Sequence, residues 1–429
     1  MKERASPRSV ALTAVRRVTE EGAYSNLVIP SLLSVSGLDR RDRALASELA
    51  YGTIRRTIPL DHVIGSAASR PVDRITPGAL ATLRLGAYQL LFTEIAAHAA
   101  VSETVALAGP RERGFVNAVL RRLSATPPPM LSGDDDRSIS TRTGLAPWAV
   151  EELRRILGDE VEECASALAA PGGLCLRVNT CRVARDRLVE ALQEDGHDPI
   201  PAALDPDCLL LQRGDPSTFP GFREGWFAVQ DQASAFVVQA LDPRRGERIW
   251  DACAGPGGKA GAIACAVGAD GLVVASDLHP SRARRVRAQA ARLGVRTLVL
   301  AQDAMLPALA GVFDRVLVDA PCSGIGAARR RPELLWRPHK QDLSGLARLQ
   351  VELVSGAAAL VRPGGRLVYA VCTFPRAETD AVADALARRR PDLRPVEAPG
   401  PSGPALRHRL WPHRHGSDAM FVAVFEKER

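Results

Sequence analysis

Residues Phe313–Arg331 read FDRVLVDAPCSGIGAARRR, which is an apolar run followed by an acid and a thiol. The three adjacent apolar residues 316–318 are typical of a strand that is covered on both faces of a sheet. Asp319 and Cys322 come next, at the carboxyl end of the predicted strand, where open parallel sheets bind their ligands. A single cysteine after a strand is most often a small buried apolar residue. Together with Asp319, however, it makes this edge a candidate site for chemistry.

Further apolar strands, separated by helices, are predicted on both sides of this stretch. Predicted strands and helices alternate from Arg248 onward, which indicates an α/β fold with a doubly wound, mostly parallel sheet. A last strand follows a long helix, and we expect it to be the antiparallel edge strand. The predicted strands are 248–252, 272–277, 297–301, 315–319, 366–371 and 422–425, and the predicted helices include 282–293, 342–360 and 377–389.

The N-terminal part has a different pattern. Apolar residues recur at helical spacing between residues 8 and 123, which predicts an all-helical region. Glycines and prolines are interpreted as breaks between these helices. The breaks are Gly52, Pro59, Pro71 and Pro77-Gly78.

The region between these two parts divides into a linker and a small α/β segment. Residues 124–140 contain three prolines, a glycine and three consecutive aspartates, a composition that predicts a linker unable to order by itself. A helix is expected from Pro147 to about residue 158. Further predicted elements are a strand at 174–179, a helix at 185–194 and a strand at 208–211.

Composition narrows the class of protein. The chain has 429 residues, which suits two or three domains, and 46% apolar and 24% charged residues are typical of a globular protein. No run of 18 apolar residues and no signal peptide is visible, which argues against a membrane or secreted protein. Eight scattered cysteines without a C-x-x-C pair predict neither a metal site nor a disulfide framework. We therefore expect a reduced, cytoplasmic protein.

The net charge of the chain gives a moderate indication of the kind of molecule that it binds. The net charge is +7, which is compatible with a polyanion such as nucleic acid. Arginine outnumbers lysine, and arginine is the better clamp for phosphate. The codon bias of a GC-rich genome explains the arginine content equally well.

A glycine-rich turn, Asp251–Lys259 (DACAGPGGK), follows one predicted strand and begins a helix. Main-chain N–H groups in such a turn approach a ligand closely, although the turn alone could serve NAD, FAD or no ligand at all. The dinucleotide pattern G-x-G-x-x-G is interrupted by Pro256. Asp277 and Asp303 lie at the ends of the next two strands, where each could simply cap a helix or turn. In register with the glycine-rich turn, they favour a nucleoside ligand.

Several of these strings resemble the RNA cytosine-C5 methyltransferases of the RsmB/NOP family, which use S-adenosylmethionine. D-A-P-C-S-G-x-G with R-R-x-P-E-L-x-W is similar to the family's fourth motif, and C-A-G-P-G-G-K is similar to its first. Y-A-V-C-T surrounds Cys372, and R-V-N-T and V-Q-D-Q-A-S match pieces of its small RNA-binding subdomain. The chain departs from the family's usual residues at Gly255 and Ala260, where the family has Ala and Thr. It also departs at Val371, at Ala377 before Glu378, and at Ala419-Met420.

The N-terminal strings resemble a second family. R-A-S-P-R-S-V-A-L-T-A-V, L-R-L-G-A-Y-Q-L-L-F and G-F-V-N-A-V-L-R-R-L are similar to the helical bundle of the NusB family over residues 5–123. The resemblance implies RNA binding through exposed basic residues, and the candidates are Arg8, Arg55, Arg56, Arg121 and Arg122. The expected domains are a NusB-like bundle at 1–125, a linker at 126–145, a small α/β RNA-binding subdomain at 146–235 and a Rossmann-like methyltransferase domain at 236–429.

The resemblance also implies roles for individual residues. Cys372 is the expected nucleophile at C6 of cytosine, and Cys322 assists release as, or through, a general base. Asp319 holds N3 and the amino group of the flipped base. Lys259 either lowers a thiol pKa or contacts the cytosine. By analogy with DNA cytosine methyltransferases, Cys322 is the alternative nucleophile. The residues expected to bind S-adenosylmethionine are Cys253, Ala254, Gly255, Pro256, Gly257, Gly258, Lys259, Asp277, Asp303 and Asp319.

The NusB-like bundle favours 16S ribosomal RNA, free or in a partial small-subunit particle, as the substrate of a monomeric enzyme without a metal. Action on tRNA or another RNA is the alternative in the same class. A non-catalytic RNA-binding assembly protein is the alternative in another class, and the retained Asp319, Cys322 and Cys372 argue against it. A nucleotide-dependent oxidoreductase is disfavoured by Pro256 and the two cysteines.

Overall fold

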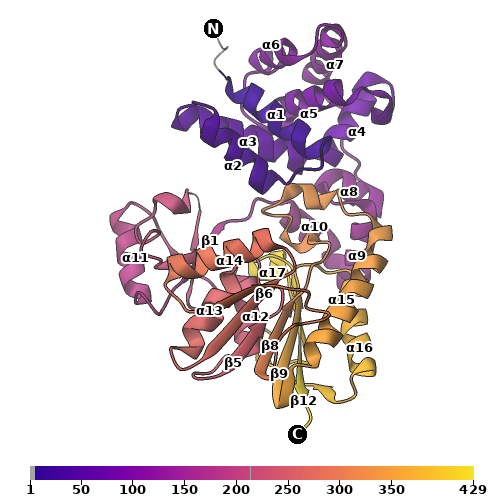
Figure 1. Cartoon of the computed structure of the whole chain (residues 1–429). Coiled ribbons are helices and arrows are strands. Elements are labelled where there is room, and N and C mark those ends of the chain that lie inside the picture. Colours follow the sequence, from indigo (N-terminus) through magenta and orange to yellow (C-terminus); the bar gives the residue numbers. More distant parts are fainter. Residues whose placement is uncertain (1–4, 213) are drawn as a thin grey trace. The chain divides into compact units, whose positions relative to one another are not determined.

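A computed structural model gives the structure of the chain and describes residues 5–212 and 214–429. Two compact units are present. Unit 1 comprises Met1–Ala170 and Ala328–Lys340, and unit 2 comprises Pro171–Ala327 and Gln341–Arg429. Figure 1 shows the elements of both units along the chain. The short segment Ala328–Lys340 follows the Asp319–Cys322 stretch in sequence but belongs to unit 1.

Unit 1 is helical, as predicted for its N-terminal part. One apolar core, which includes Val15, Leu49, Ile54, Leu83 and Leu120, is shared by the helices of the bundle. These helices are α1 (Pro7–Thr19), α2 (Ser25–Val35), α3 (Arg40–Arg55), α4 (Thr57–Ala68), α5 (Pro77–Phe92), α6 (Ala97–Leu107) and α7 (Arg113–Ala125).

Gly52 does not end a helix, contrary to the prediction. It lies inside α3, where a Cβ atom would overlap the ring of Tyr88 on α5. The Tyr88 hydroxyl donates a hydrogen bond to Glu48, one turn before Gly52 on α3 (2.7 Å). Pro59 is likewise not a break, since it lies in the first turn of α4. Helices tolerate proline there because the first N–H groups have no partner within the helix.

The predicted linker contains a helix, so its expected lack of structure was wrong. α8 (Asp136–Thr143) lies within it and packs near α9 (Pro147–Leu157) and α10 (Val161–Ala169). Asp135 caps α8 by accepting hydrogen bonds from the main-chain N–H groups of Arg137 and Ser138. Asp136 pairs with Arg154 of α9 (2.7 Å). The aspartates that indicated a solvated linker therefore serve as a cap and an ion-pair partner.

The segment Ala328–Lys340 is held in unit 1 by buried polar contacts. The carboxylate of Glu333 is fully buried and accepts hydrogen bonds from the N–H and the hydroxyl of Ser25 (3.2 and 2.6 Å). The indole N–H of Trp336 donates to the carbonyl of Ile54 (2.9 Å). Contacts of this kind are costly to break inside a protein, so they anchor the segment.

The first part of unit 2 is a small α/β subdomain. Its sheet has the order β2–β3–β1–β4, and its core includes Leu176, Leu188, Leu209 and Phe227. The elements are β1 (Leu174–Val178), α11 (Arg185–Glu194), β2 (Ile200–Pro201), β3 (Cys208–Leu211) and β4 (Phe227–Val229). The predicted helix at 185–194 and strand at 208–211 are confirmed.

A disulfide joins Cys181, which follows β1, to Cys265, with 5.7 Å between their Cα atoms. The expectation of no disulfide was therefore wrong for this pair. The two residues are 84 positions apart, and only the packing of the small subdomain against the rest of unit 2 brings them together. The spacing of the cysteines in the sequence contains no sign of it.

The second part of unit 2 is the predicted doubly wound sheet. Its strand order is β10–β12–β9–β8–β5–β6–β7, with β11 also paired to β12. The strands are β5 (Arg248–Asp251), β6 (Leu272–Asp277), β7 (Leu298–Ala301), β8 (Phe313–Asp319), β9 (Val361–Val371), β10 (Leu393–Pro395), β11 (Arg407–Leu410) and β12 (Met420–Lys427). β12 is antiparallel to β9, as expected, but β10 lies outside it at the edge.

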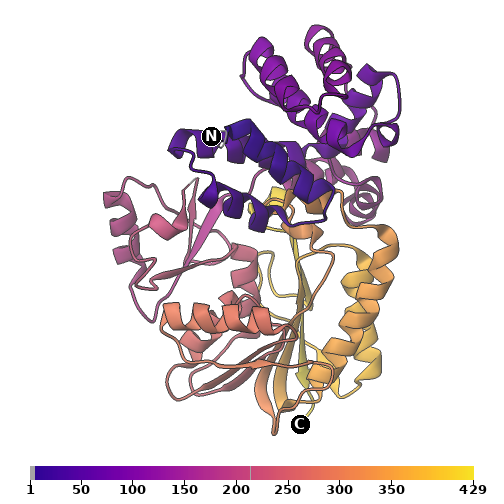
Figure 2. The ribbon, with the colours of Figure 1, turned by 45° about the horizontal axis from the view of Figure 1, so that its top comes forward.

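Helices cover both faces of this sheet (Figure 1). Ile249 and Leu317 pack toward the helices on one face, whereas Trp250 and Val316 pack toward those on the other. This alternation explains why the buried strands read as continuous apolar runs. Figure 2 shows α14 and α15 on opposite sides of the sheet. The helices are α12 (Gln232–Leu241), α13 (Gly258–Val267) and α14 (Pro280–Leu293) on one face and α15 (Leu343–Ala358) and α16 (Asp380–Arg389) on the other; the short α17 (Pro412–His415) precedes β12. Within residues 5–212 and 214–429, no helix is long and apolar enough to cross a membrane.

We predict that Gly52→Ala lowers the free energy of unfolding of the full chain by about 1–3 kcal/mol, because the added methyl group must displace the Tyr88 ring in a packed core. Urea unfolding followed by circular dichroism measures this change. Gly114→Ala in α7 is the control, since a Cβ atom there meets nothing within 4 Å and alanine favours the helix. Equal stability of the two variants would contradict the close contact.

Candidate active site

The register between β8 and β9 brings the two predicted cysteines together. The strands are parallel, and Asp319 at the end of β8 lies opposite Ala370 of β9. The chain then continues to Cys322 on one side and to Cys372 on the other. The Sγ atoms of these cysteines lie 3.4 Å apart, and both side chains are half-buried. Both cysteines follow consecutive predicted strands of the sequence, and in the structure their thiols lie side by side.

Lys259 lies beside this pair. It is the second residue of α13, and its Nζ donates hydrogen bonds to Asp319 Oδ2 (2.7 Å) and to Ser234 Oγ of α12 (3.2 Å). Burial by itself would lower the pKa of Lys259, but the charge of Asp319 and the hydrogen bond to it outweigh burial and raise the pKa. The charge of Cys372 acts in the same direction. Lys259 therefore stays a cation within electrostatic range of that thiol.

The thiol of Cys322 keeps its proton. Its pKa is raised well above the usual value by the hydrogen bond with Cys372, by burial and by the nearby charges, among them Glu378 and Asp319. A protonated Cys322 can donate its S–H to Cys372. Such a donor stabilises negative charge on the sulfur that accepts it.

A buried glutamate, Glu378, connects the loops that carry the two cysteines. Its side chain is fully buried and accepts hydrogen bonds from the N–H and the hydroxyl of Ser323 (2.8 and 2.6 Å) and from Gln350 (3.0 Å). Ser323 Oγ also lies 2.7 Å from the hydroxyl oxygen of Thr373. Burial raises the pKa of Glu378, and the hydrogen bonds from Ser323 oppose this rise.

The local sequence predicts no role for Glu378. Its position six residues after Cys372 was visible in the family motif, and that spacing is the one signal that could have drawn attention to it. The residues that bond to Glu378 lie on other segments of the chain. The local sequence therefore does not reveal its burial or its partners.

The glycine-rich turn lies next to Asp277, as expected. The N–H of Gly255 donates to Asp277 Oδ2 (3.3 Å), and a Cβ atom on Gly255 would lie 2.5 Å from the same oxygen. Gly257 has a φ of 111°, a left-handed conformation that glycine adopts without strain. The other oxygen of Asp277 accepts from the N–H of His279 (2.9 Å). A side chain at position 255 would therefore require the carboxylate of Asp277 to shift.

Asp251, at the end of β5, is buried beneath the same turn. Neither of its carboxylate oxygens has a hydrogen-bond partner among the described residues. Burial and the charge of Asp319 raise the pKa of Asp251 to about 7. Burial and the charge of Asp251 also raise the pKa of Cys253, so this thiol of the turn is not an ionised nucleophile at neutral pH.

Asp303 has a local role in the structure. β7 ends at Ala301, as predicted, and Asp303, two residues beyond it, accepts a hydrogen bond from the N–H of Met305 (2.9 Å). This geometry is that of a turn residue. A part in ligand binding remains a prediction. No cluster of three or more metal-ligating side chains occurs in the described residues.

The basic residues predicted for RNA binding differ in exposure. Arg55 is buried and donates to the carbonyls of Ala169, Ala170 and Arg329, so the expectation that it is exposed was wrong. A guanidinium inside the bundle can satisfy main-chain oxygens of neighbouring segments, and the amphipathic pattern does not reveal this. Arg8 and Arg56 are half-buried, and Arg121 and Arg122 are exposed.

We predict that the stability of the wild type relative to Asp251→Asn falls as the pH rises from 5 to 8. Because the pKa of Asp251 is raised to about 7, the folded protein still holds a proton between about pH 4 and 7 that the unfolded chain has released. The asparagine variant cannot lose a proton, so it lacks this decline of about 1–3 kcal/mol.

Urea unfolding at both pH values measures the difference. Asp270→Asn, which changes an exposed carboxylate paired with Arg245, is the control. If wild type and Asp251→Asn differed in the free energy of unfolding by the same amount at both pH values, Asp251 would have an ordinary pKa.

Known proteins match this chain along its whole length. Models of the NusB family, of the RsmF/B-like ferredoxin-like domain and of the 16S rRNA methyltransferases RsmB/F match residues 5–125, 146–217 and 238–426. A Mycobacterium tuberculosis protein named as a methyltransferase is 40% identical over 98% of this chain and 96% of its own. The ribosomal RNA small subunit methyltransferase B of Escherichia coli is 33% identical over 100% of both chains. The crystal structure of PH0851 has a TM-score of 0.86 at 25% identity and covers 99% of both chains. The chain therefore belongs to the RsmB/F family of 16S rRNA methyltransferases.

Proposed function

We propose that the protein transfers a methyl group from S-adenosylmethionine to C5 of a cytosine in 16S ribosomal RNA, through a covalent bond between Cys372 and C6 of the base. The observation that carries this proposal is the pair of thiols, 3.4 Å apart, beside the Lys259–Asp319 ion pair. Both lie at the carboxyl edge of the sheet, where an α/β fold holds its substrates.

The residues of the glycine-rich turn fit the cofactor. Main-chain N–H groups at the start of α13 and the buried carboxylate of Asp277 form one cradle, and each oxygen of Asp277 can accept a further hydrogen bond from a ribose hydroxyl. Asp303 would lie toward the adenine amino group. When bound, the cofactor supplies an electrophilic methyl group on its sulfonium.

Cys372 is the proposed nucleophile. C5 of cytosine does not attack a methyl group unaided, and addition of a thiolate at C6 gives C5 the character of an enamine. The cation of Lys259 and the S–H of Cys322 both favour negative charge on Cys372. The cation of Lys259 therefore favours a thiolate at Cys372.

Asp319 and Lys259 bind the base and stabilise the charge that develops on its ring. Asp319 accepts a hydrogen bond from the amino group of the cytosine, and N3 gains a proton as negative charge builds on the ring. Lys259, 2.7 Å from Asp319, is the adjacent proton donor. Once the methyl group is on C5, the C5 proton leaves to a base that Cys322 orients, the bond between C6 and Cys372 breaks, and Cys372 departs as a thiolate.

Glu378 keeps the two cysteine loops in place in this scheme. Its hydrogen bonds to Ser323 fix the residue after Cys322, and Ser323 in turn contacts Thr373, the residue after Cys372. Reacting groups must be held to within fractions of an ångström, and such buried support supplies that precision.

The activity has a direct test. Incubation of unmethylated 16S ribosomal RNA with the protein and S-adenosylmethionine is expected to protect one or a few cytosines from bisulfite conversion. If 16S RNA stayed unprotected and tRNA became methylated, tRNA would be the substrate. The absence of methylation on any RNA would contradict the proposal.

The two cysteines can be distinguished by trapping. We expect Cys372→Ala to abolish methyl transfer, and Cys322→Ala to stall after it, with RNA still bound to Cys372. The trapped complex should migrate as a slow band on a denaturing gel, should require S-adenosylmethionine and should be absent from the Cys322→Ala/Cys372→Ala double variant.

The reverse pattern, with a band from Cys372→Ala alone, would make Cys322 the nucleophile. Absence of a band from both single variants would remove the covalent scheme.

The cofactor site is tested by Asp277→Ala. Loss of this buried acceptor is expected to weaken S-adenosylmethionine binding by about 1–3 kcal/mol in calorimetry. Asp270→Ala, at an exposed position on the loop before β6, should leave binding unchanged. Unchanged affinity in Asp277→Ala would place the ribose elsewhere.

A further inference from the structure

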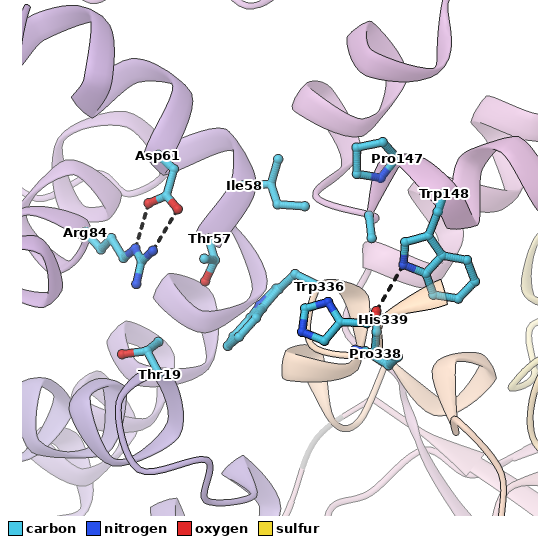
Figure 3. A pocket seen from close by; sticks show the side chains of 11 residues that line it. Thr19, Thr57, Ile58, Asp61, Arg84, Pro147, Trp148, Trp336, Pro338 and His339 are labelled. Atoms are coloured by element: carbon cyan, nitrogen blue, oxygen red, sulfur yellow. Dashed lines mark hydrogen bonds and ion pairs between the residues drawn. The ribbon is translucent and has the colours of Figure 1, made fainter. Parts of the chain in front are cut away.

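Unit 1 contains a cavity of about 370 Å³ that the proposed chemistry does not use (Figure 3). Its walls come from α1, α4 and α5 of the bundle, from the start of α9 and from residues 336–339. Trp148, Trp336 and His339 are the aromatic residues of the lining. The volume lies at the small end of the range of ligand sites. A cavity of this size with flat walls suits one planar group.

The two indole rings are held in place by hydrogen bonds at their edges. The N–H of Trp148 donates to the carbonyl of Pro338 (3.0 Å), as Figure 3 shows, and the N–H of Trp336 donates to Ile54 (2.9 Å). Both side chains are half-buried. Because the N–H groups are already used and Arg337 lies over the Trp336 ring, 5.7 Å from its centroid, Trp148 is the ring that we expect to offer a face to a ligand. Aromatic faces of fixed orientation are what unpaired bases stack on.

A polar pair on another wall can read the edge of such a base. Arg84 donates two hydrogen bonds to Asp61, each of 2.7 Å (Figure 3). A guanidinium has five N–H groups and a carboxylate has about four acceptor positions, so the pair retains both donors and acceptors. The edges of nucleobases present the same mixture of donors and acceptors.

The charge beside the cavity favours a polyanion. Arg56 precedes the lining residue Thr57, and Arg337 lies between Trp336 and Pro338. Arg337 donates to the carbonyls of Val18, Gly22 and Ala23, and Arg56 donates to that of Arg142. In the described part of the chain, neither forms an ion pair, so their positive charges are not compensated. A guanidinium bound to neutral carbonyls remains available to attract phosphate.

We propose that this cavity holds one unpaired base of the RNA substrate, as a binding subsite of unit 1, which contains neither of the two cysteines. The inference rests on the proposed function for its ligand, an RNA. An apolar peptide would leave the Asp61–Arg84 pair and the flanking charges unused, whereas a nucleotide uses the aromatic face, the pair and the charges together.

The test measures binding of a fluorescein-labelled single-stranded oligouridylate to the full-length protein. Trp148→Leu removes the aromatic face and is expected to weaken binding by roughly 5- to 150-fold, the range for loss of one stacked base. Trp148→Phe loses the same N–H but keeps an aromatic face, and it should retain most of the affinity. Phe115→Leu, at a half-buried aromatic of α7 outside the cavity, should bind like the wild type. Equal affinities of Trp148→Leu and wild type would overturn the proposal.

Photo-crosslinking of RNA that contains 4-thiouridine gives a second measurement. Cross-links are expected on peptides that contain Trp148 or residues 336–339, and cross-links confined to other peptides would also overturn the subsite. Methylation of 16S RNA by the wild type is assayed in parallel. Normal methylation with unchanged oligonucleotide binding in Trp148→Leu would refute the subsite alone. Absence of methylation with cross-links in the cavity would refute the proposed function alone.

Discussion

Strands β8 and β9 pair in parallel with Asp319 opposite Ala370, and the candidate active site depends on this register. Parallel strands end at the same edge of a sheet, so the loop of Cys322 and the end of β9 at Cys372 must meet there. A shift of one residue would turn the side chains of β9 to the opposite face. The hydrogen bonds of Glu378 and Ser323 then hold the two loops together beyond the strands.

Buried charge is the second constraint. The charges of Asp319 and Asp251 both act on Lys259, and the ion pair with Asp319 offsets the cost of removing its ammonium group from water. Asp251 has no such partner, and its raised pKa reflects that difference. Asp251 therefore remains largely neutral below pH 7.

The string that follows Cys322 belongs to both units. Residues up to Ala327 lie in unit 2, whereas Ala328–Lys340 lies in unit 1. Glu333 and Trp336 of this segment make buried hydrogen bonds to Ser25 and Ile54 of the bundle. This segment is therefore also a structural part of the helical unit, and Trp336 contributes a wall to its cavity.

The sequence by itself determined the class of fold, the strand–helix order of the catalytic part and the pairing of Cys322 with Cys372, because these depend on local periodicity and on the edge at which parallel strands end. Only the tertiary structure decided what depends on contacts between distant segments. Gly52 proved to be a close-packing position, Arg55 a buried donor, Glu378 a support for both cysteine loops and Cys181–Cys265 a disulfide. In each case the partner lies on a separate segment of the chain, and local patterns of apolar and polar residues contain no information about which distant segment packs against which.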